Sequence, residues 1–482
     1  MAEIRKSTIV SGLLWKFAER ILAQLVGFAL SIVLARILDP SAYGLIAIVN
    51  VFTAITSVFV TSGFSTSLIQ SQRVDETDFC SIFWAAMFVS SIIYAGMFFI
   101  SPCIASFYKE PCLTPIIRVC SLILFIGAFN SIQGAYVSRH MQFRLFFFAS
   151  LFGSLGSGAI GIVMAILGCG VWSLVAQSLA NSLINTAVLF FFVPWKPRLL
   201  FSIESAKNLM GYGWKILASD LFGTIYNNLR TLILGKVYTT SDLAFYSRGQ
   251  SFPDLLSTNI SSTLSAVLFP ALSKISDDMD SMKIAFGRIL KCVSFAVFPI
   301  MTMLIVVARP LVAVLLTDKW IDCVPFIQII AVARMMDIVP SQNLQVIRAL
   351  GRSDIALKLE FIKKPLCLIV TLVSCMFGIE AVAFSWVVCA FIEVLVDVYP
   401  NRLLIGYGYR AQTTDCLPAL FLSLVMGASM LLIGIMPLPP FSLLLLEVIV
   451  GAVVYLGLSY AFRLSAFFEL LTVLRGALGR TE

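Results

Sequence analysis

The sequence predicts an all-α integral membrane protein with about fourteen transmembrane helices. Of its 482 residues, 59% are hydrophobic and 12% are charged, and the mean hydropathy is +0.96. Soluble domains contain about 45–50% apolar and about 25% charged residues, because a chain folded in water needs a polar surface. Apolar runs of about 20 residues, the length that crosses a bilayer as a helix, recur along the whole chain.

These runs are separated by short polar segments rich in Gly and Pro, such as "ILDPSAYG", "KEPCLTP" and "MPLPP". No connecting segment is long enough for a separate soluble domain. The N-terminal "MAEIRKSTIV" is short and polar, which does not match a cleaved signal peptide. The predicted spans are centred on residues 12–36, 43–68, 79–101, 115–137, 146–167, 171–193, 213–235, 244–271, 287–307, 323–347, 361–378, 381–403, 415–435 and 441–462.

The distribution of positive charge predicts the orientation. Most of the 34 lysines and arginines lie at span ends and connections that face one side if the N-terminus is inside. Cytoplasmic loops carry the excess of Lys and Arg, so we expect both termini in the cytoplasm. The net charge of +8 largely reflects this bias and does not indicate a nucleic-acid partner.

The chain contains a weak internal repeat. "LARILDPSAYGLIAI" (34–48) aligns with "GKVYTTSDLAFYSR" (235–248), and each follows a span that begins with Trp-Lys. An even number of spans separates the copies, so both enter the membrane in the same direction, as in parallel repeats. We therefore expect one six-helix bundle over residues 1–205, a second over 206–410, and two additional transmembrane helices and a cytoplasmic tail over 411–482.

Polar side chains form a stripe on the first helix of each predicted bundle. A charged residue in mid-bilayer costs about 2.5–3.5 kcal/mol on insertion scales, so the stripes predict a water-filled cleft between the bundles. The alternative is that the two cations of the first helix reach the inner headgroups and that Arg230 reaches the outer headgroups. The stripe residues are Lys16, Arg20, Gln24, Gly27 and Ser31 in one helix, and Asp220, Thr224, Asn227 and Thr231 in the other, with Arg230 beside them.

Two later spans also carry charge. In the tenth span Arg334 and Asp337 lie one turn apart before Pro340, which indicates either an ion pair in a kinked helix or a discontinuous helix that holds substrate. In the twelfth span, Glu393 and Asp397 either bind a cation or pair with neighbouring basic residues. The polar start of the eighth span, "SRGQSFPDLLSTNISST" after Tyr246, is expected to line the outer cleft.

Motifs for common chemistry are missing from the sequence. It contains no GxxxxGK[ST], HExxH or GxSxG motif, and its 11 cysteines include no CxxC pair. "DDMD" (277–280) contains the DxD of many glycosyltransferases, but its short segment is better interpreted as a solvated charge run. We expect neither an enzyme nor a metal site.

Several phrases together resemble the polysaccharide transporter family. They are "LARILDPSAYGLIAI", "GWKILASDLFGTIYNNLRTLILGKVY", "LAFYSRG", "LFPALSK" and "ALGRSD". The resemblance covers about residues 8–460 and is to Wzx-type lipid-linked oligosaccharide flippases of the MOP superfamily, which also contains MATE exporters and lipid II flippases. It implies two lobes in a V around a cationic cleft, two extra C-terminal helices, and a place in the bacterial inner membrane.

The resemblance also implies a cargo and a mechanism. The cargo would be an undecaprenyl-diphosphate oligosaccharide, flipped by alternating access for capsule, exopolysaccharide or O-antigen synthesis, with polymerase and chain-length proteins as further partners. The positions matched to the cationic cleft are Lys16, Arg20 and Arg230, more loosely Arg248 and Arg334, with Gln24 and Asn227 beside them. The candidates for coupling to Na⁺ or H⁺ are Glu19, Asp220, Glu393 and Asp397; no other cofactor is implied.

Two other functions are each compatible with part of the sequence. A MATE-type multidrug exporter shares the fold but would present acidic residues to organic cations, whereas the deep charges here are balanced in number. A membrane-embedded oligosaccharide polymerase or ligase would need a large outer loop with catalytic Arg or His, and the predicted outer loops are short.

Overall fold

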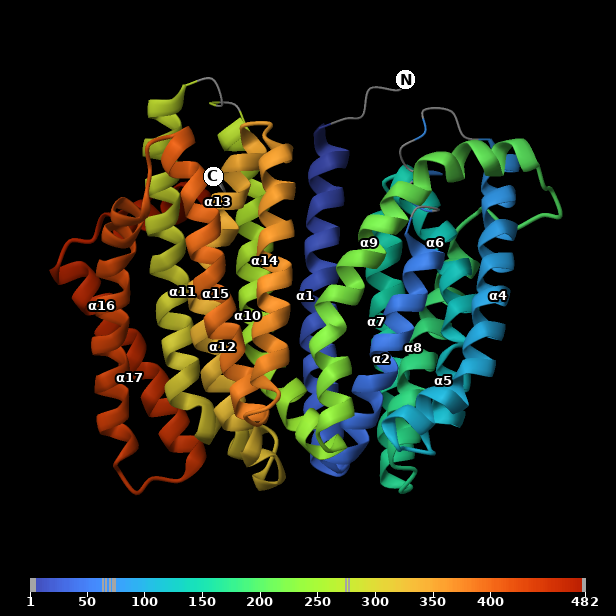
Figure 1. The fold of residues 1–482 in the computed structure, drawn as a ribbon, viewed down its shortest axis with the longest axis horizontal. Helices are drawn as coiled ribbons and strands as arrows, with labels where there is room; N and C mark the ends of the chain where they lie inside the picture. Colours follow the sequence, from blue (N-terminus) through green and yellow to red (C-terminus); the bar gives the residue numbers. More distant parts are fainter. Residues whose placement is uncertain are drawn as a thin grey trace. The chain divides into compact units, whose positions relative to one another are not determined.

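The computed structural model describes residues 6–62, 65, 67–68, 71, 75–273, 275 and 278–478. All regular elements in these ranges are helices, and the chain forms two compact units, residues 1–244 and 245–482 (Figure 1). Ten helical segments of the described chain are long and apolar enough to cross a membrane. The prediction of an all-α, multi-pass membrane protein is therefore confirmed.

Four predicted spans are helical but are not among these ten segments. They are α1 (Lys6–Ile37), α9 (Ile203–Val237), α10 (Thr240–Ser273) and α14 (Ser353–Ser374). The described apolar part of α1 is Leu22–Ile37. The other three combine sufficient length with many polar residues, so a hydropathy criterion does not identify them.

Within the described residues, the first unit contains α1 and α9 together with six helices between them. Its core lies where α4, α6 and α8 meet, and Phe83, Ile132 and Leu189 are buried there. The six intervening helices are α2 (Pro40–Thr61), α4 (Glu76–Tyr108), α5 (Leu113–Cys120), α6 (Ile123–Arg139), α7 (Phe143–Ile166) and α8 (Val171–Phe192).

Small residues let α7 pack closely against both of its neighbours. A Cβ on Gly158 would lie 2.3 Å from Cδ2 of Leu30 in α1, and one on Gly161 would lie 3.0 Å from Cβ of Gln177 in α8. "GSLGSGAIG" (153–161) is thus a helix-packing face, which is the usual role of small residues spaced by four in membrane helices.

The second unit is built around α11, which contacts α12, α16, α17 and α18. In the "DDMD" run, the Asp278 side chain accepts hydrogen bonds from the backbone N–H groups of Asp280 and Ser281 and caps α11. The hydrogen bond from the Ser281 hydroxyl, together with these backbone contacts, lowers the pKa of Asp278. The helices are α10 from residue 245, α11 (Met279–Leu315), η1 (Asp318–Cys323), α12 (Val324–Met336), α13 (Ile338–Ala349), α14, α15 (Ile379–Leu404), α16 (Tyr409–Gly434), α17 (Pro440–Ala461) and α18 (Ser465–Leu478).

The two copies of the repeat form equivalent corners. α1 ends at Ile37 and α2 begins at Pro40, whereas α9 ends at Val237 and α10 begins at Thr240. The corners touch within the first unit, because a Cβ on Gly44 would lie 1.8 Å from the carbonyl oxygen of Thr240. α9 also packs on α2 and α4, so by contacts it belongs with the first unit. The repeat-based boundary at residue 205 stays a prediction.

Candidate functional site

The predicted cleft residues are divided between the two units. In the first unit, α1 packs on α7. Near the end of α1 that is predicted to face the cytoplasm, Trp15 contacts Phe147 with a ring-centroid distance of 5.2 Å. Glu19 and Gln24 are half-buried on the same helix. The side chains of Lys16 and Arg20 lie outside the described residues, so their role stays a prediction.

The other candidates of the first unit lie on α9. Asp220 and Asn227 are exposed, and Arg230 is half-buried. Near the C-terminal end of α9, the Tyr108 hydroxyl donates to the Leu232 carbonyl at 3.2 Å, and Lys236 donates to the carbonyl of Phe107. These bonds hold the C-terminal part of α9 against α4 and thereby fix the position of Arg230 relative to α4.

A polar stripe on α8 was not predicted. Gln177, Asn181 and Asn185 are spaced by four residues, and all three face the small residues of α7. The Asn130 amide donates to Asn185 at 2.9 Å and thereby joins α6 to α8. The four-residue spacing inside an apolar run could have revealed this stripe, whose contacts identify it as a helix-packing device.

Arg334 in the second unit lies between two carboxylates. Its Nε is 2.7 Å from Asp254 of α10, and its Nη1 is 2.5 Å from Asp337, which lies between α12 and α13. The guanidinium also lies 4.4 Å from the ring centroid of Trp386. The ion pair of the first sequence interpretation is observed, and the helix is interrupted at Asp337. To bind diphosphate, Arg334 would have to break its ion pairs with both carboxylates. This role stays a prediction.

Arg248 lies on α10, above a buried tryptophan. Its guanidinium carbon is 5.7 Å from the ring centroid of Trp320, and the side chain is half-buried. The next residue, Gly249, brings α10 against α12, since a Cβ there would lie 2.5 Å from Cβ of Phe326. The structure thus fixes the position of Arg248 within its own unit.

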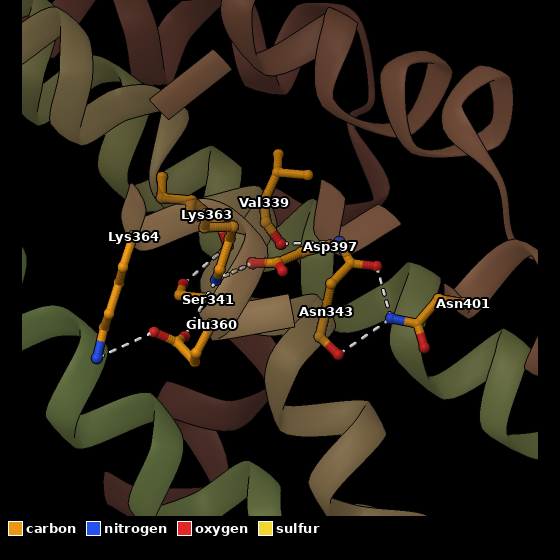
Figure 2. A network of polar contacts seen from close by, with 9 residues as sticks. Val339, Ser341, Asn343, Glu360, Lys363, Lys364, Asp397 and Asn401 are labelled. Atoms are coloured by element: carbon orange, nitrogen blue, oxygen red, sulfur yellow. Dashed lines mark hydrogen bonds and ion pairs between the residues drawn. The ribbon is translucent and has the colours of Figure 1, made fainter. Parts of the chain in front are cut away.

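Asp397 pairs with a lysine of the neighbouring helix. Lys363 Nζ lies 2.8 Å from Asp397 Oδ2 and 3.2 Å from Glu360 Oε1, while Lys364 approaches the other oxygen of Glu360 at 3.4 Å (Figure 2). The Lys363 side chain is 7% exposed and that of Asp397 is 1% exposed. Of the two interpretations of Asp397, pairing with a basic residue is the one seen here. Glu393 is half-buried one turn earlier on α15.

A buried amide network begins one turn further along α15, at Asn401. Asn401 Nδ2 donates to the side-chain oxygen of Asn343 at 2.7 Å, and Asn343 Nδ2 donates to Gln412 Oε1 at 2.7 Å (Figure 2 shows the first contact). Gln412 returns a bond to Asn343 Oδ1 at 2.9 Å. α13, α15 and α16 are therefore joined by side chains that have little access to solvent.

Two largely buried cations of the second unit, Arg334 and Lys363, thus have carboxylate partners within that unit. Arg334 has two carboxylate partners, and the pair of Lys363 and Lys364 faces Asp397 and Glu360. No group of three or more His, Cys, Asp or Glu side chains within the described ranges is arranged to hold a metal ion. The sequence did not indicate Lys363, Asp254, Asn343 or Gln412 as partners, because each comes from a different helix than the residue it contacts.

The comparisons with known proteins identify a family of polysaccharide biosynthesis proteins. Residues 33–325 match the family model described as "Polysaccharide biosynthesis protein". The chain is 23% identical to the lipopolysaccharide biosynthesis protein WzxC of Escherichia coli, over 87% of this chain and 86% of that protein. It is 22% identical to the succinoglycan biosynthesis transport protein ExoT of Rhizobium meliloti, over 81% and 78% respectively.

Solved structures show the same fold. The lipid II flippase MurJ in an inward closed conformation superposes with a TM-score of 0.75 at 16% identity, covering 93% of this chain and 98% of that one. An inward-facing MATE multidrug resistance transporter gives 0.58 at 13% identity, covering 82% and 100%. Since the family model spans well over half of the sequence, this chain belongs to the polysaccharide biosynthesis protein family and has the fold shared by MurJ and the MATE transporters.

Proposed function

We propose that this protein flips an undecaprenyl-diphosphate-linked oligosaccharide from the inner to the outer leaflet of the bacterial inner membrane, for synthesis of a surface polysaccharide. The observation that carries the proposal is the family match over residues 33–325. Support comes from relatives named for lipopolysaccharide biosynthesis and succinoglycan transport, and from the similarity of the fold to a lipid II flippase.

The physical task is to move a multiply charged diphosphate through an apolar layer. Guanidinium and ammonium groups in a hydrated cleft replace the water around the phosphates with charge-assisted hydrogen bonds. In this proposal Lys16, Arg20 and Arg230 bind the diphosphate, with Gln24 and Asn227 beside them. Arg248, in the second half of the chain, also binds the diphosphate as it crosses the membrane. The polyprenyl tail stays in lipid as the two bundles alternate between inward- and outward-open states.

The finer architecture belongs to the same proposal. Fourteen transmembrane helices form two six-helix bundles in a V, followed by two further helices, and both termini lie in the cytoplasm. Support comes from the equivalent corners at α1–α2 and α9–α10 and from the bias of positive charge. Polymerase and chain-length proteins would receive the cargo on the outer side.

Coupling to an ion gradient would use the acidic residues of the spans. Asp397 is the most sharply defined of them, because it is buried and bound to the ammonium of Lys363. Protonation of Asp397 or Glu393, or entry of Na⁺ beside them, would release Lys363 and change the packing of α14 on α15. Glu19 and Asp220 are the corresponding candidates in the first unit.

A multidrug exporter is the second candidate. Two carboxylates face the single guanidinium of Arg334, and this excess of negative charge would suit an organic cation. The family match favours the flippase. Export of organic cations by the purified protein, without any effect of its deletion on surface glycan, would favour the exporter.

Deletion of the gene tests the proposal directly. We expect loss of surface glycan and accumulation of lipid-linked oligosaccharide on the inner leaflet, measured by glycan staining and by leaflet-specific labelling. An unchanged distribution of oligosaccharide between the leaflets would contradict the proposed function.

Arg230→Ala tests the residue role in the same strain. A hydrogen bond to a charged group contributes about 1.5–3 kcal/mol, so transport should fall about ten- to a hundredfold. Arg230→Lys should retain part of it, and Arg198→Ala, which removes an exposed pair with Glu76, should retain all of it. Normal glycan with Arg230→Ala at normal expression would exclude Arg230 from the mechanism.

A further inference from the structure

An apolar groove of about 420 Å³ runs along the start of α7 and the end of α8. Its lining is apolar apart from Arg144 and includes Phe148 and Phe152 of α7 and Phe192 of α8. The side chains of Phe152 and Phe192 are 51% and 63% exposed, so they face the surroundings of the unit and not its core. In a membrane protein, such a surface contacts hydrocarbon.

A single cation stands at one end of the groove. The guanidinium carbon of Arg144 lies 5.6 Å from the ring centroid of Trp15 and 5.4 Å from that of Phe148, and the side chain is exposed. It forms no ion pair with any carboxylate of the described ranges. Stacking on two rings holds the planar guanidinium in place and leaves its N–H donors available to an anion.

The backbone at this point also favours an anion. Arg144 is in the first turn of α7, which contains no acidic residue, and the N-terminus of a long helix carries partial positive charge. The groove therefore combines a strip of aromatic and aliphatic surface with a positively charged end. This is the pattern expected for an amphiphile that has an anionic head and a hydrocarbon chain.

We propose that the groove between α7 and α8 binds the head-proximal isoprene units of the cargo's polyprenyl tail, with Arg144 bound to the diphosphate. This inference rests on the proposed function and adds to it a loading site on the cytoplasmic leaflet. Trp15, which contacts Arg144, directly precedes Lys16 in the sequence, so the diphosphate would pass from Arg144 to the stripe of α1.

The size of the groove fits one short stretch of a single chain. A groove of about 420 Å³ accommodates a few isoprene units and not a whole undecaprenyl tail. A phospholipid has two chains behind one phosphodiester, and the groove has room for part of one. The cargo's diphosphate, which is esterified to the polyprenyl chain and to the sugar, carries two negative charges against the single charge of a phosphodiester, so it attracts a guanidinium more strongly.

Photolabelling of the full-length protein in phosphatidylethanolamine nanodiscs tests this inference. The probe is undecaprenyl diphosphate with a diazirine in a head-proximal isoprene unit, and mass spectrometry locates the label. We expect label on the groove residues of α7 and α8, at least a tenfold loss with Arg144→Ala, and partial retention with Arg144→Lys. Phe152→Trp, which fills the groove and keeps it apolar, should also reduce the label.

Lys196→Ala is the matched control. Lys196 is another cation on an aromatic ring, 3.9 Å from the centroid of Phe190, and it does not line the groove, so its removal should leave the label unchanged. Unlabelled undecaprenyl diphosphate should displace the probe. Equal displacement by phosphatidylglycerol would identify an ordinary lipid site and overturn the inference, as would full labelling of Arg144→Ala.

Transport measurements separate this inference from the proposed function. Normal leaflet distribution of the oligosaccharide after gene deletion would overturn the proposed function itself. If deletion and Arg230→Ala stop flipping but Arg144→Ala flips with unchanged dependence on cargo concentration, the loading site alone is wrong.

Discussion

Lys363 is a buried cation whose two carboxylate partners come from its own helix and from α15. An ion in the interior loses several kcal/mol of hydration, and a buried pair recovers this only through close contacts such as the 2.8 Å one to Asp397. Removing one partner therefore costs more than removing both. Stability measured together with transport therefore distinguishes a structural pair from a coupling site.

We expect Lys363→Met to destabilise the protein by about 3–5 kcal/mol, because it leaves the Asp397 charge buried and unpaired. The double variant Lys363→Met with Asp397→Leu should recover most of this stability. The measurement is the thermal unfolding midpoint in detergent. Arg352→Ala is the control, since its pair with Asp354 is about half exposed and contributes little.

A double variant as unstable as Lys363→Met would contradict a pairwise interaction. A stable double variant that has lost transport would show that Asp397 or Lys363 takes part in transport beyond holding α14 to α15. The same variant with full transport would remove Asp397 from the candidates for ion coupling.

At the scale of elements, Gly44 explains why the motif "LARILDPSAYG" has a glycine at its end. α2 approaches the start of α10 so closely there that any side chain would overlap the Thr240 carbonyl. The contact joins the corner that ends α1 to the corner that ends α9, so the two repeat copies meet through backbone. Such close approach through a small residue is common between membrane helices.

Gly44→Ala should therefore reduce the yield of folded protein and lower its unfolding midpoint, since its Cβ would lie 1.8 Å from a backbone oxygen that cannot rotate away. Gly96→Ala in α4 is the control, because nothing lies within 4 Å of that Cβ. Alanine is the better helix former by up to about 1 kcal/mol, so Gly96→Ala should be neutral or stabilising. Equal behaviour of the two variants would show that the corners do not need this contact.

At the scale of the whole molecule, positive charge predicts which loops face the cytoplasm. Alkaline phosphatase fused after Glu110 or Pro437 should be active, because these loops would be periplasmic. Fusions after Arg198 or Arg352 should be inactive. The opposite pattern would reverse the orientation, and equal activity at Glu110 and Arg198 would contradict an odd number of crossings between them.

The sequence by itself determined the class of protein and much of its helix pattern. Hydropathy located α8 at residues 171–192, within one residue of the prediction, and the segments aligned as a repeat contain the corners at Ile37 and Val237. Hydropathy underestimated the length of helices with polar ends, since α11 spans residues 279–315 and the predicted span covered 287–307. Hydropathy detects the part of a helix in hydrocarbon and not the turns that continue into the headgroup region.

Only the tertiary structure decided which polar residues meet. Arg334 contacts Asp254 across 80 positions of sequence, and Lys363 contacts Asp397 across 34. Periodicity places a side chain on one face of its own helix. Its partner depends on which helix packs against that face and on how far the two helices are shifted along their axes. For that reason the charged residues of the spans could be named from the sequence, whereas the assignment of α9 to the first unit and the neutralisation of Arg334 required the packed helices.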